Sequence, residues 1–264
     1  MTWRPDWHRV DIISDLHLQV SEPATARAWF DYLRTAPFDA LFILGDLFEV
    51  WVGDDVLHGP AEDPSATFAR RCVHALHVLS QRAPVFVMQG NRDFLLGPAF
   101  ASAAGCTLID DPCVMAWDDH RWLLSHGDAW CLDDRDYLAF RAEVRQADWQ
   151  AAFLARPLVE RQAIARQLRE RSEQRKQASL AQGDAFPDVD HDVALDWLRR
   201  TRTSDLIHGH THRPAIHRLG EDHRRVVLSD WDADSQPPRL EALSVWRSGV
   251  IERGVLRPCP PLTP

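Results

Sequence analysis

The sequence predicts a layered α/β fold. Six short apolar runs of strand length recur along its 264 residues, and helical patterns separate the early runs at about 22–35 and 64–82. Strands that alternate with helices are typical of a sheet covered by helices. The six expected strands are RVDIIS (9–14), DALFIL (39–44), PVFVM (84–88), RWLLS (121–125), SDLIH (204–208) and RVVLS (225–229).

The pattern changes between residues 132 and 182, where no strand is indicated. A long helical stretch, DWQAAFLARPLVERQAIARQLRERSEQRKQ, fills much of this region, and Pro157 is expected to interrupt it. Residues 156–176 carry seven basic side chains against three acidic ones. From position alone, two interpretations stay open: a solvated helical hairpin packed on the sheet, or a cap over an active site with an apolar lining and a cationic rim.

These patterns suggest a division of the chain into three parts. We expect a core built from residues 1–131 and 183–256, a helical insertion at 132–182 and a Pro-rich tail at 257–264. The apolar side chains that would line the insertion are Trp149, Phe153, Leu154, Leu158, Ile164 and Leu168.

Composition excludes several classes of protein. The formal net charge of −9 argues against a general nucleic-acid binder, because affinity for phosphates requires a basic surface. The five cysteines are odd in number and form no CxxC pair, so we expect reduced thiols in an intracellular protein. The charged N-terminus does not look like a signal peptide, and no apolar run approaches the ~18 residues of a membrane span. Any membrane contact is therefore expected to be peripheral.

Metal-competent side chains follow five of the six expected strands. They occur in DLH (15–17), GD (45–46), GNRD (90–93), HGD (126–128) and GHTH (209–212). In an open α/β sheet, ligands bind beyond the carboxyl ends of the strands, so these groups should meet along one edge. The residues in question are Asp15, His17, Asp46, Asn91, His126, His210 and His212.

The spacing and chemistry of this set indicate a metal centre. Asp15 and His17 are two residues apart, as are His210 and His212, and alternate residues of an extended chain point to the same side. Oxygen and imidazole ligands without a thiolate suit Mn²⁺, Fe²⁺ or Zn²⁺. Seven ligands are too many for one tetrahedral ion and fit two ions that share one carboxylate. His208 adjoins the GHTH run, and the sequence leaves its role open.

The motifs DLH, GDLFEVWVGDD, GNRDFLLG, SHGD and IHGHTHRP resemble those of the calcineurin-like metallophosphoesterases. The likeness covers roughly residues 9–217, and the combination GDLFE…GNRDFLLG…IHGHTHRP is similar to the subgroup that hydrolyses UDP-2,3-diacylglucosamine in the lipid A pathway of Gram-negative bacteria. The resemblance implies a four-layer αββα core, and it favours the cap interpretation of residues 132–182.

The resemblance also implies how the ligands are divided between two Mn²⁺ ions, with Fe²⁺ or Zn²⁺ as alternatives. One ion would be held by Asp15, His17, Asp46 and His212, and the other by Asp46, Asn91, His126 and His210, so that Asp46 bridges them. Two such ions clamp the attacking and leaving oxygens of an in-line displacement. Asn91, Arg92 and His210 are the expected catalytic residues.

Arg92 stands where many phosphatases of this superfamily carry a histidine that can act as a general acid. An arginine does not release its proton, but its guanidinium can form a fork on phosphate oxygens. It therefore suits a leaving group that needs no protonation, such as a phosphate monoester leaving from a pyrophosphate. Asp93 is expected either to hold a neighbouring side chain or to be a turn residue.

The implied reaction converts UDP-2,3-diacylglucosamine to UMP and 2,3-diacylglucosamine 1-phosphate. The resemblance implies substrate contacts from Asn91, Arg92, Asp134, Ser172 and His210, and Lys176 is a further candidate in a region where the likeness fades. The UDP-linked, diacylated glucosamine substrate predicts a peripheral enzyme on the anionic, cytoplasmic face of the inner membrane; no protein partner is expected. The alternatives are a generic phosphodiesterase or phosphomonoesterase, and a non-catalytic protein-binding scaffold of the same fold.

Overall fold

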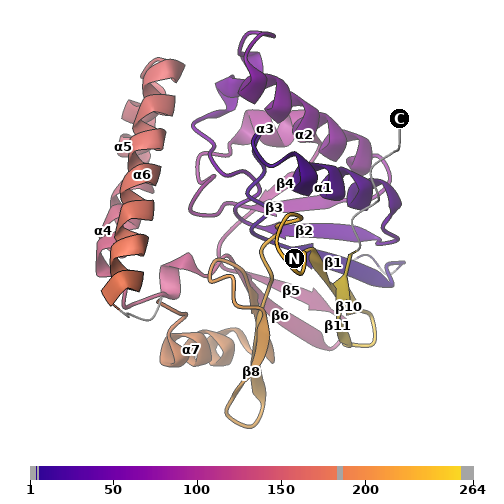
Figure 1. The fold of residues 1–264 in the computed structure, drawn as a ribbon. Coiled ribbons are helices and arrows are strands. Elements are labelled where there is room, and N and C mark those ends of the chain that lie inside the picture. Colours follow the sequence, from indigo (N-terminus) through magenta and orange to yellow (C-terminus); the bar gives the residue numbers. More distant parts are fainter. Residues whose placement is uncertain (1–3, 5, 183–186, 257–264) are drawn as a thin grey trace.

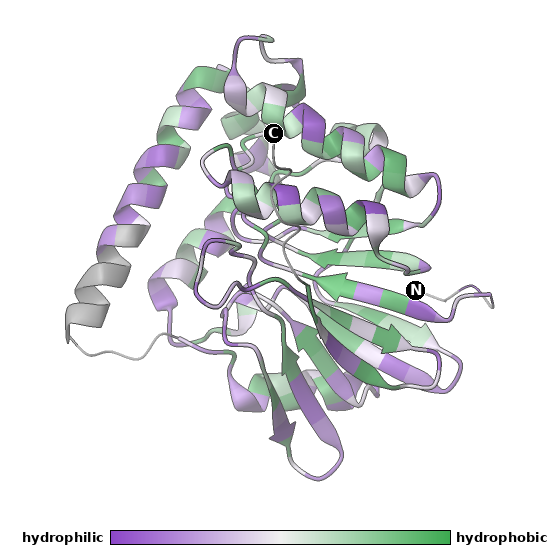
Figure 2. Cartoon of the chain, turned by 45° about the vertical axis from the view of Figure 1, so that its right-hand side comes forward, coloured by the Kyte–Doolittle hydropathy of each residue, from purple (hydrophilic) through white to green (hydrophobic). Residues whose placement is uncertain are grey.

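A computed structural model describes residues 4, 6–182 and 187–256; for residue 173 and residues 175–182 it describes the backbone alone. Two mixed β-sheets face each other, and helices cover their outer faces (Figure 1). Figure 2 shows most of the sheet strands in the colours of hydrophobic residues, as expected for sheets that are covered on both faces.

The first sheet has six strands in the order β11-β10-β1-β2-β3-β4. The strands β1 to β4 are parallel, and β10 runs antiparallel to β1 and to β11. Their bounds are β1 Arg9–Ile13, β2 Ala40–Leu44, β3 Val85–Met88, β4 Thr107–Ile109, β10 Glu241–Trp246 and β11 Ile251–Val255.

The second sheet has five strands in the order β5-β6-β7-β9-β8. Its central strands β6, β7 and β9 are parallel, and the two edge strands are antiparallel to their neighbours. Their bounds are β5 Cys113–Trp117, β6 His120–Ser125, β7 Asp205–His208, β8 Ala215–Leu219 and β9 His223–Val227.

Alternating side chains of the strands divide the core into layers. In β2, Leu41 and Ile43 point to the helices outside the first sheet, whereas Phe42 and Leu44 point between the sheets. Beyond the second sheet, Leu206 of β7 packs with Leu198 of α7. The covering helices are α1 Pro23–Thr35, α2 Pro64–Ser80 and α3 Pro98–Ala104 on one side and α7 His191–Thr201 on the other. The four-layer αββα prediction is confirmed.

Three helices stand beside this sandwich, between β6 and α7 in the chain (Figure 1). They are α4 Arg135–Val144, α5 Ala147–Leu154 and α6 Leu158–Gln182. Pro157 lies between α5 and α6, where its ring cannot continue a helix, so the predicted interruption is confirmed. We call α4 to α6 the helical insertion; its division from the core at residues 132 and 182 stays a prediction.

The six predicted strands all form, with ends that differ by at most two residues from the expected ones. The strands β4, β5, β8, β10 and β11 and the helices α3, α4 and α7 come in addition to the individually predicted elements. Some, such as β4 and α3, are short, whereas α7 has an amphipathic pattern that the sequence analysis missed. Two short 3₁₀ helices, Asp54–His58 and Asp128–Trp130, lie in connecting segments.

The remaining expectations concern single features of the chain. Four thiols lie in the described part, at Cys72, Cys106, Cys113 and Cys131, and all four are free. Cys259 and the Pro-rich tail at 257–264 lie outside the described residues. No helix in the described part combines the length and hydropathy needed to cross a membrane.

Candidate dinuclear metal centre

The predicted ligands come together at the carboxyl ends of the strands. Turns after β1, β2 and β3 of the first sheet meet turns after β6 and β7 of the second. The backbone confirms this convergence, since the amide of Asp15 donates to the carbonyl of Gly45, and the amide of His210 donates to Asp15 Oδ2. Residues separated by almost two hundred positions therefore share one site.

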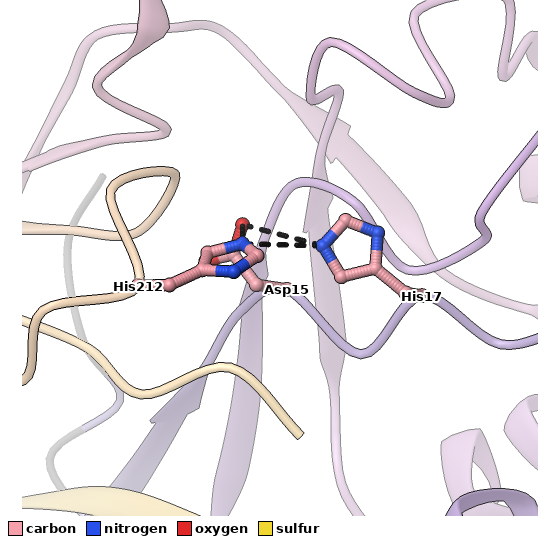
Figure 3. Close-up of side chains that lie close together, drawn as sticks. All are labelled: Asp15, His17 and His212. Carbon is pink, nitrogen blue, oxygen red and sulfur yellow. Dashed lines mark hydrogen bonds and ion pairs between the residues drawn. The ribbon is translucent and has the colours of Figure 1, made fainter. Parts of the chain in front are cut away.

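Three of these side chains form the first cluster (Figure 3). The Nε2 atoms of His17 and His212 face each other at 3.3 Å, and His212 Nε2 lies 3.3 Å from Asp15 Oδ1. His17 Nε2 is 3.9 Å from the same carboxylate oxygen. These three potential ligand atoms lie within 4.8 Å of one another, so a single cation could contact all of them.

The second cluster is built around Asn91. Its side-chain Oδ1 lies 2.9 Å from His126 Nε2 and 2.9 Å from His210 Nδ1. His126 Nε2 is also 3.7 Å from Asp46 Oδ1. One side-chain oxygen and two imidazole nitrogens thus converge beside a carboxylate, which is a donor set that a divalent transition metal accepts.

Asp46 connects the two clusters. Its Oδ1 faces His126, whereas its Oδ2 lies 3.9 Å from His17 Nε2. The carboxylate is almost fully buried, and the backbone amide of Arg92 donates to Oδ1 at 2.8 Å. A carboxylate whose two oxygens face different ligand groups has the geometry of a bridge between two ions.

The backbone at this edge is strained. Asp15, His17, Asp46, His210 and His212 all have left-handed conformations, with φ between 47° and 66°. This conformation is uncommon for residues with a Cβ atom, and its cost is tolerated where the surrounding structure holds it in place for a function. Five of the seven predicted ligands share it.

Glycines bring the turns close enough for these contacts. A Cβ atom at Gly90 would lie 2.1 Å from Asp46 Oδ1, and one at Gly209 would lie 2.2 Å from Asp15 Oδ2. Only a residue without a side chain leaves room for the carboxylates at these positions.

The arrangement fits two divalent cations. Asp15 Oδ1 is buried and accepts no hydrogen bond from the described residues, which is unfavourable for a carboxylate oxygen without a cation beside it. The two clusters together supply three carboxylate or amide groups and four imidazoles.

Metal-binding imidazoles are commonly oriented by an acceptor at their second nitrogen, and three of these histidines have such an acceptor nearby. The pairs are His17 Nδ1 with Glu49 at 2.8 Å, His126 Nδ1 with the carbonyl of Leu44 at 2.9 Å, and His212 Nδ1 with Asp230 at 3.7 Å.

The side chains at the centre influence one another's protonation. Burial alone would lower the pKa of His126, but the negative charges of Asp46 and Asp15 raise it to about 9. Burial and the charge of His126 lower the pKa of His210 to about 3. Burial opposes ionisation of Asp15, yet the neighbouring histidines, His212 first, hold the pKa of this carboxyl well below its usual range. Excess negative charge therefore attracts a cation or a proton to the centre.

Named relatives align with most of this chain. Residues 8–214 match the family model of calcineurin-like phosphoesterases. A UDP-2,3-diacylglucosamine hydrolase of Chromohalobacter salexigens is 41% identical over 87% of this chain and 95% of its own length. Proteins of the same name from Xanthomonas oryzae pv. oryzae and Bordetella pertussis are 45% and 40% identical, over 87% and 90% of this chain and 94% and 92% of their own lengths.

The chain belongs to the calcineurin-like phosphoesterase family, and within it to the UDP-2,3-diacylglucosamine hydrolases.

The other predicted residues of this calcineurin-like phosphoesterase occupy different surroundings. Arg92 lies at the site, and its Nη1 is 3.4 Å from Glu49 Oε1. Asp134 caps α4 by accepting from the amide of Tyr137. Ser172 lies half-buried on α6. Lys176 is part of α6, but its side chain lies outside the described residues.

The two open questions on Asp93 and His208 receive structural answers. The buried Asp93 accepts from the backbone amides of Leu47 and Gly90, each at 2.8 Å, so it holds two turns. Among the described residues, no His or Arg side chain forms a hydrogen bond with it. Burial and the charge of Asp46 raise its pKa to about 6. His208 is buried with its Nδ1 bonded to the carbonyl of Gly209, and it is absent from both ligand groups in the described residues.

Several residues of this phosphoesterase site were missed by the sequence analysis. Glu49 contacts His17, and Arg169 of α6 lies 3.3 Å from Glu49 and 3.3 Å from Gln19. Tyr137 of α4 stacks on the His210 ring and donates to Asp128, which also accepts from Arg141. The acidic residue in GDLFE was a visible signal for Glu49. No signal in the sequence pairs residues 169 and 49.

The helical insertion thus reaches the metal centre from two directions. Through Tyr137 and Arg141, α4 contacts the turn after β6, and through Arg169, α6 contacts the segment after β2. The rings of Trp149 and Phe153 stack at 4.8 Å between centroids, and Trp149 meets Phe94 of the core. These contacts favour the cap interpretation over a solvated hairpin.

Proposed function

We propose that the protein hydrolyses the pyrophosphate bond of UDP-2,3-diacylglucosamine to UMP and 2,3-diacylglucosamine 1-phosphate, the last being a two-chain lipid. The observation that carries this proposal is the pair of ligand clusters joined by Asp46, with Arg92 held beside them. Relatives at 40–45% identity that bear the name of this hydrolase support the choice of substrate.

For the ligands we propose the division that the resemblance implies. One Mn²⁺ would be held by Asp15, His17, Asp46 and His212. The other would be held by Asp46, Asn91, His126 and His210. Fe²⁺ or Zn²⁺ could take the place of Mn²⁺. When bound, such a pair supplies positive charge to the phosphoryl oxygens and brings the pKa of a water near neutrality. The protein's part is to hold seven ligand side chains in place before the substrate arrives, so that little reorganisation is needed during the reaction.

Arg92 determines which leaving group the site can serve. Its guanidinium cannot act as a proton donor at neutral pH, but it can bind two phosphate oxygens at once. A phosphate monoester leaves a pyrophosphate without protonation, whereas a simple alkoxide does not leave readily. Glu49 holds Arg92 and His17 together, so the phosphate-binding group and a metal ligand share one anchor.

Further substrate contacts are proposed from Asn91, Arg92 and His210 at the centre, and from Asp134, Ser172 and Lys176 on the helical insertion. Ser172 follows Arg169 by one turn of α6, and residues three apart lie on the same side of a helix. The contact of Arg169 with Glu49 therefore supports a substrate contact by Ser172. For the acyl chains, the exposed Leu154 and the half-buried Trp149 and Leu158 offer apolar surface, with about 0.8 kcal/mol for each CH₂ removed from water. Phe153 is instead buried against the core.

The place of action follows from the substrate. We propose that the protein acts on the cytoplasmic face of the inner membrane as a peripheral enzyme, with the helical insertion toward the lipid. Arg156, Arg166 and Arg171 of the insertion are exposed, and so are Leu154 and Val159. Cationic side chains near an anionic membrane contribute about 1 kcal/mol each.

A substrate panel tests this function. Purified protein with added Mn²⁺ is assayed on UDP-2,3-diacylglucosamine, UDP-glucose, a cyclic nucleotide and p-nitrophenyl phosphate, with Asp46→Ala as the inactive control. We expect turnover of the diacylated substrate to exceed that of the others. Efficient turnover of the small esters alone would instead support a generic phosphodiesterase or phosphomonoesterase. Failure to bind Mn²⁺, Fe²⁺ or Zn²⁺ would support a non-catalytic scaffold.

A further inference from the structure

A cavity adjoins the metal centre on the side of His17. It has a volume of about 170 Å³ and lies between the segment after β1 and the segment after β9. Its polar lining consists of His17, Gln19, Glu22, Thr25, Asp230, Asp232 and Arg239. Because His17 belongs both to the cavity wall and to the first ligand cluster, a molecule in this cavity would touch the centre directly.

Most polar groups of the cavity already have partners in the protein. Asp230 accepts from Arg239 at 2.9 Å and lies 3.7 Å from His212 Nδ1. Asp232 accepts from Arg239 and from the amides of Asp234 and Ser235. These groups form the wall and leave little hydrogen-bonding capacity for a ligand.

Two side chains keep hydrogen-bonding capacity. Within the described part of the chain, the half-buried Glu22 carboxylate has neither a hydrogen bond nor an ion pair. Gln19 accepts from Arg169 at 3.3 Å, and its amide NH₂ has no acceptor among the described residues. The cavity therefore offers a carboxylate acceptor and an amide donor next to the place where a phosphate would bind.

This pair of groups matches a ribonucleoside. Carboxylates bind ribose hydroxyls in nucleotide sites, because a vicinal diol can donate to both oxygens of one carboxylate. An amide NH₂ donates to the carbonyl oxygens of uracil. An acyl chain would gain little here, since its binding depends on apolar surface, and that surface lies on the helical insertion.

We propose that the cavity beside His17 is the subsite for the nucleoside half of the substrate, with Glu22 accepting from the ribose hydroxyls and Gln19 contacting the base. The inference rests on the proposed function, in which the substrate carries a nucleoside on one side of the pyrophosphate and an acylated sugar on the other. The nucleoside then occupies the polar cavity, and the acylated sugar extends under the helical insertion.

The test measures binding of UMP and of 2′-deoxy-UMP to Mn²⁺-loaded protein by calorimetry. Glu22→Gln keeps the shape of the side chain and removes its charge, and Glu221→Gln, exposed on the turn after β8, is the matched control. We expect the wild-type protein and the control to bind UMP about ten-fold more tightly than deoxy-UMP. In Glu22→Gln this preference should disappear, and in Gln19→Ala the affinity for both nucleotides should fall about equally.

Enzyme kinetics separate this inference from the proposed function. Glu22→Gln should raise the KM for UDP-2,3-diacylglucosamine and leave hydrolysis of bis-p-nitrophenyl phosphate unchanged. If the wild-type protein does not hydrolyse the lipid substrate, the proposed function is wrong. If it does, and either UMP does not bind or Glu22→Gln keeps the preference for UMP, the nucleoside subsite is wrong.

Discussion

Glu49 binds three cationic or proton-bearing groups at once: His17 at 2.8 Å, Arg92 at 3.4 Å and Arg169 at 3.3 Å. Burial would raise its pKa, but the bond to His17 and the charges of the two arginines lower it to about 2. The carboxylate is thus ionised at neutral pH. A single buried charge thereby orients a metal ligand, a phosphate-binding group and a helix of the insertion.

Glu49→Gln keeps the size of this side chain and removes its charge. We expect the affinity for Mn²⁺ to fall by ~10- to 100-fold, because groups that orient a ligand from outside contribute that much. Metal titration of the purified variant measures the effect, with Glu221→Gln as a control of equal charge change. A metal affinity equal to that of the wild type would show that His17 needs no such support.

Arg92→Ala should lower turnover and, unlike Glu49→Gln, should leave metal binding intact. It removes the group proposed to bind phosphate oxygens and leaves all seven ligands in place, so turnover should drop on the order of 100-fold while metal content stays near that of the wild type. Steady-state kinetics and elemental analysis of the same sample measure the two quantities. Unchanged turnover would contradict the phosphate-binding role.

At the scale of elements, a buried arginine attaches α6 to the core. Only 1% of Arg161 is exposed, and its guanidinium donates to the carbonyls of Val52 and Arg156 and to the carboxylate of Asp55. Gly53 makes room for it, since a Cβ atom there would lie 2.4 Å from Arg161 Nη1. The insertion is therefore fixed to the segment that follows Glu49.

Arg161→Met should lower the free energy of unfolding by ~1–3 kcal/mol, because the buried carbonyl of Val52 loses its donor. Breaking a fully buried ion pair lowers the free energy of unfolding by more than this. That larger loss is not expected here, because half of the Asp55 side chain is exposed. Urea unfolding measures the change, with Arg166→Met on the exposed side of the same helix as control. The KM for the lipid substrate should rise more than that for a small phosphodiester. An equal rise for both substrates would show that Arg161 does not support binding of the lipid substrate.

At the scale of the whole molecule, the charge distribution decides how the protein can meet a membrane. The chain carries a net charge of −9, so an anionic surface repels it on average. Residues 156–176, with seven basic side chains against three acidic ones, are the exception, so the proposed membrane association requires this part to face the surface. Figure 2 shows hydrophobic and hydrophilic residues alternating along α6.

Binding to vesicles that contain anionic lipid tests this orientation. Replacing Arg156, Arg166 and Arg171 together by Gln should weaken co-sedimentation several-fold at low salt, and the wild-type interaction should decrease as salt screens the charges. The same change at Arg34, Arg200 and Arg218, exposed elsewhere on the core, is the control. Equal loss in both triple variants would argue against binding through the insertion.

Sequence alone predicted the core of the fold and which candidate ligands come together. A local apolar run predicts a buried strand, and each candidate ligand follows such a run within a few residues. Both signals therefore lie in short segments such as LFILGD or LIHGHTH. The rule that ligands bind beyond strand ends then brings Asp46 and His210 together without any knowledge of distances.

Only the tertiary structure decided what surrounds those ligands. The contacts of Glu49 with Arg169, of Arg161 with Val52 and of Tyr137 with His210 join segments from more than seventy to well over one hundred positions apart, and no local period records them. The cavity beside Glu22 likewise exists only where two distant segments leave space between them. Short segments of the sequence determine which chemical groups follow each strand. Contacts between distant side chains, and the cavities between segments, depend on how the layers pack.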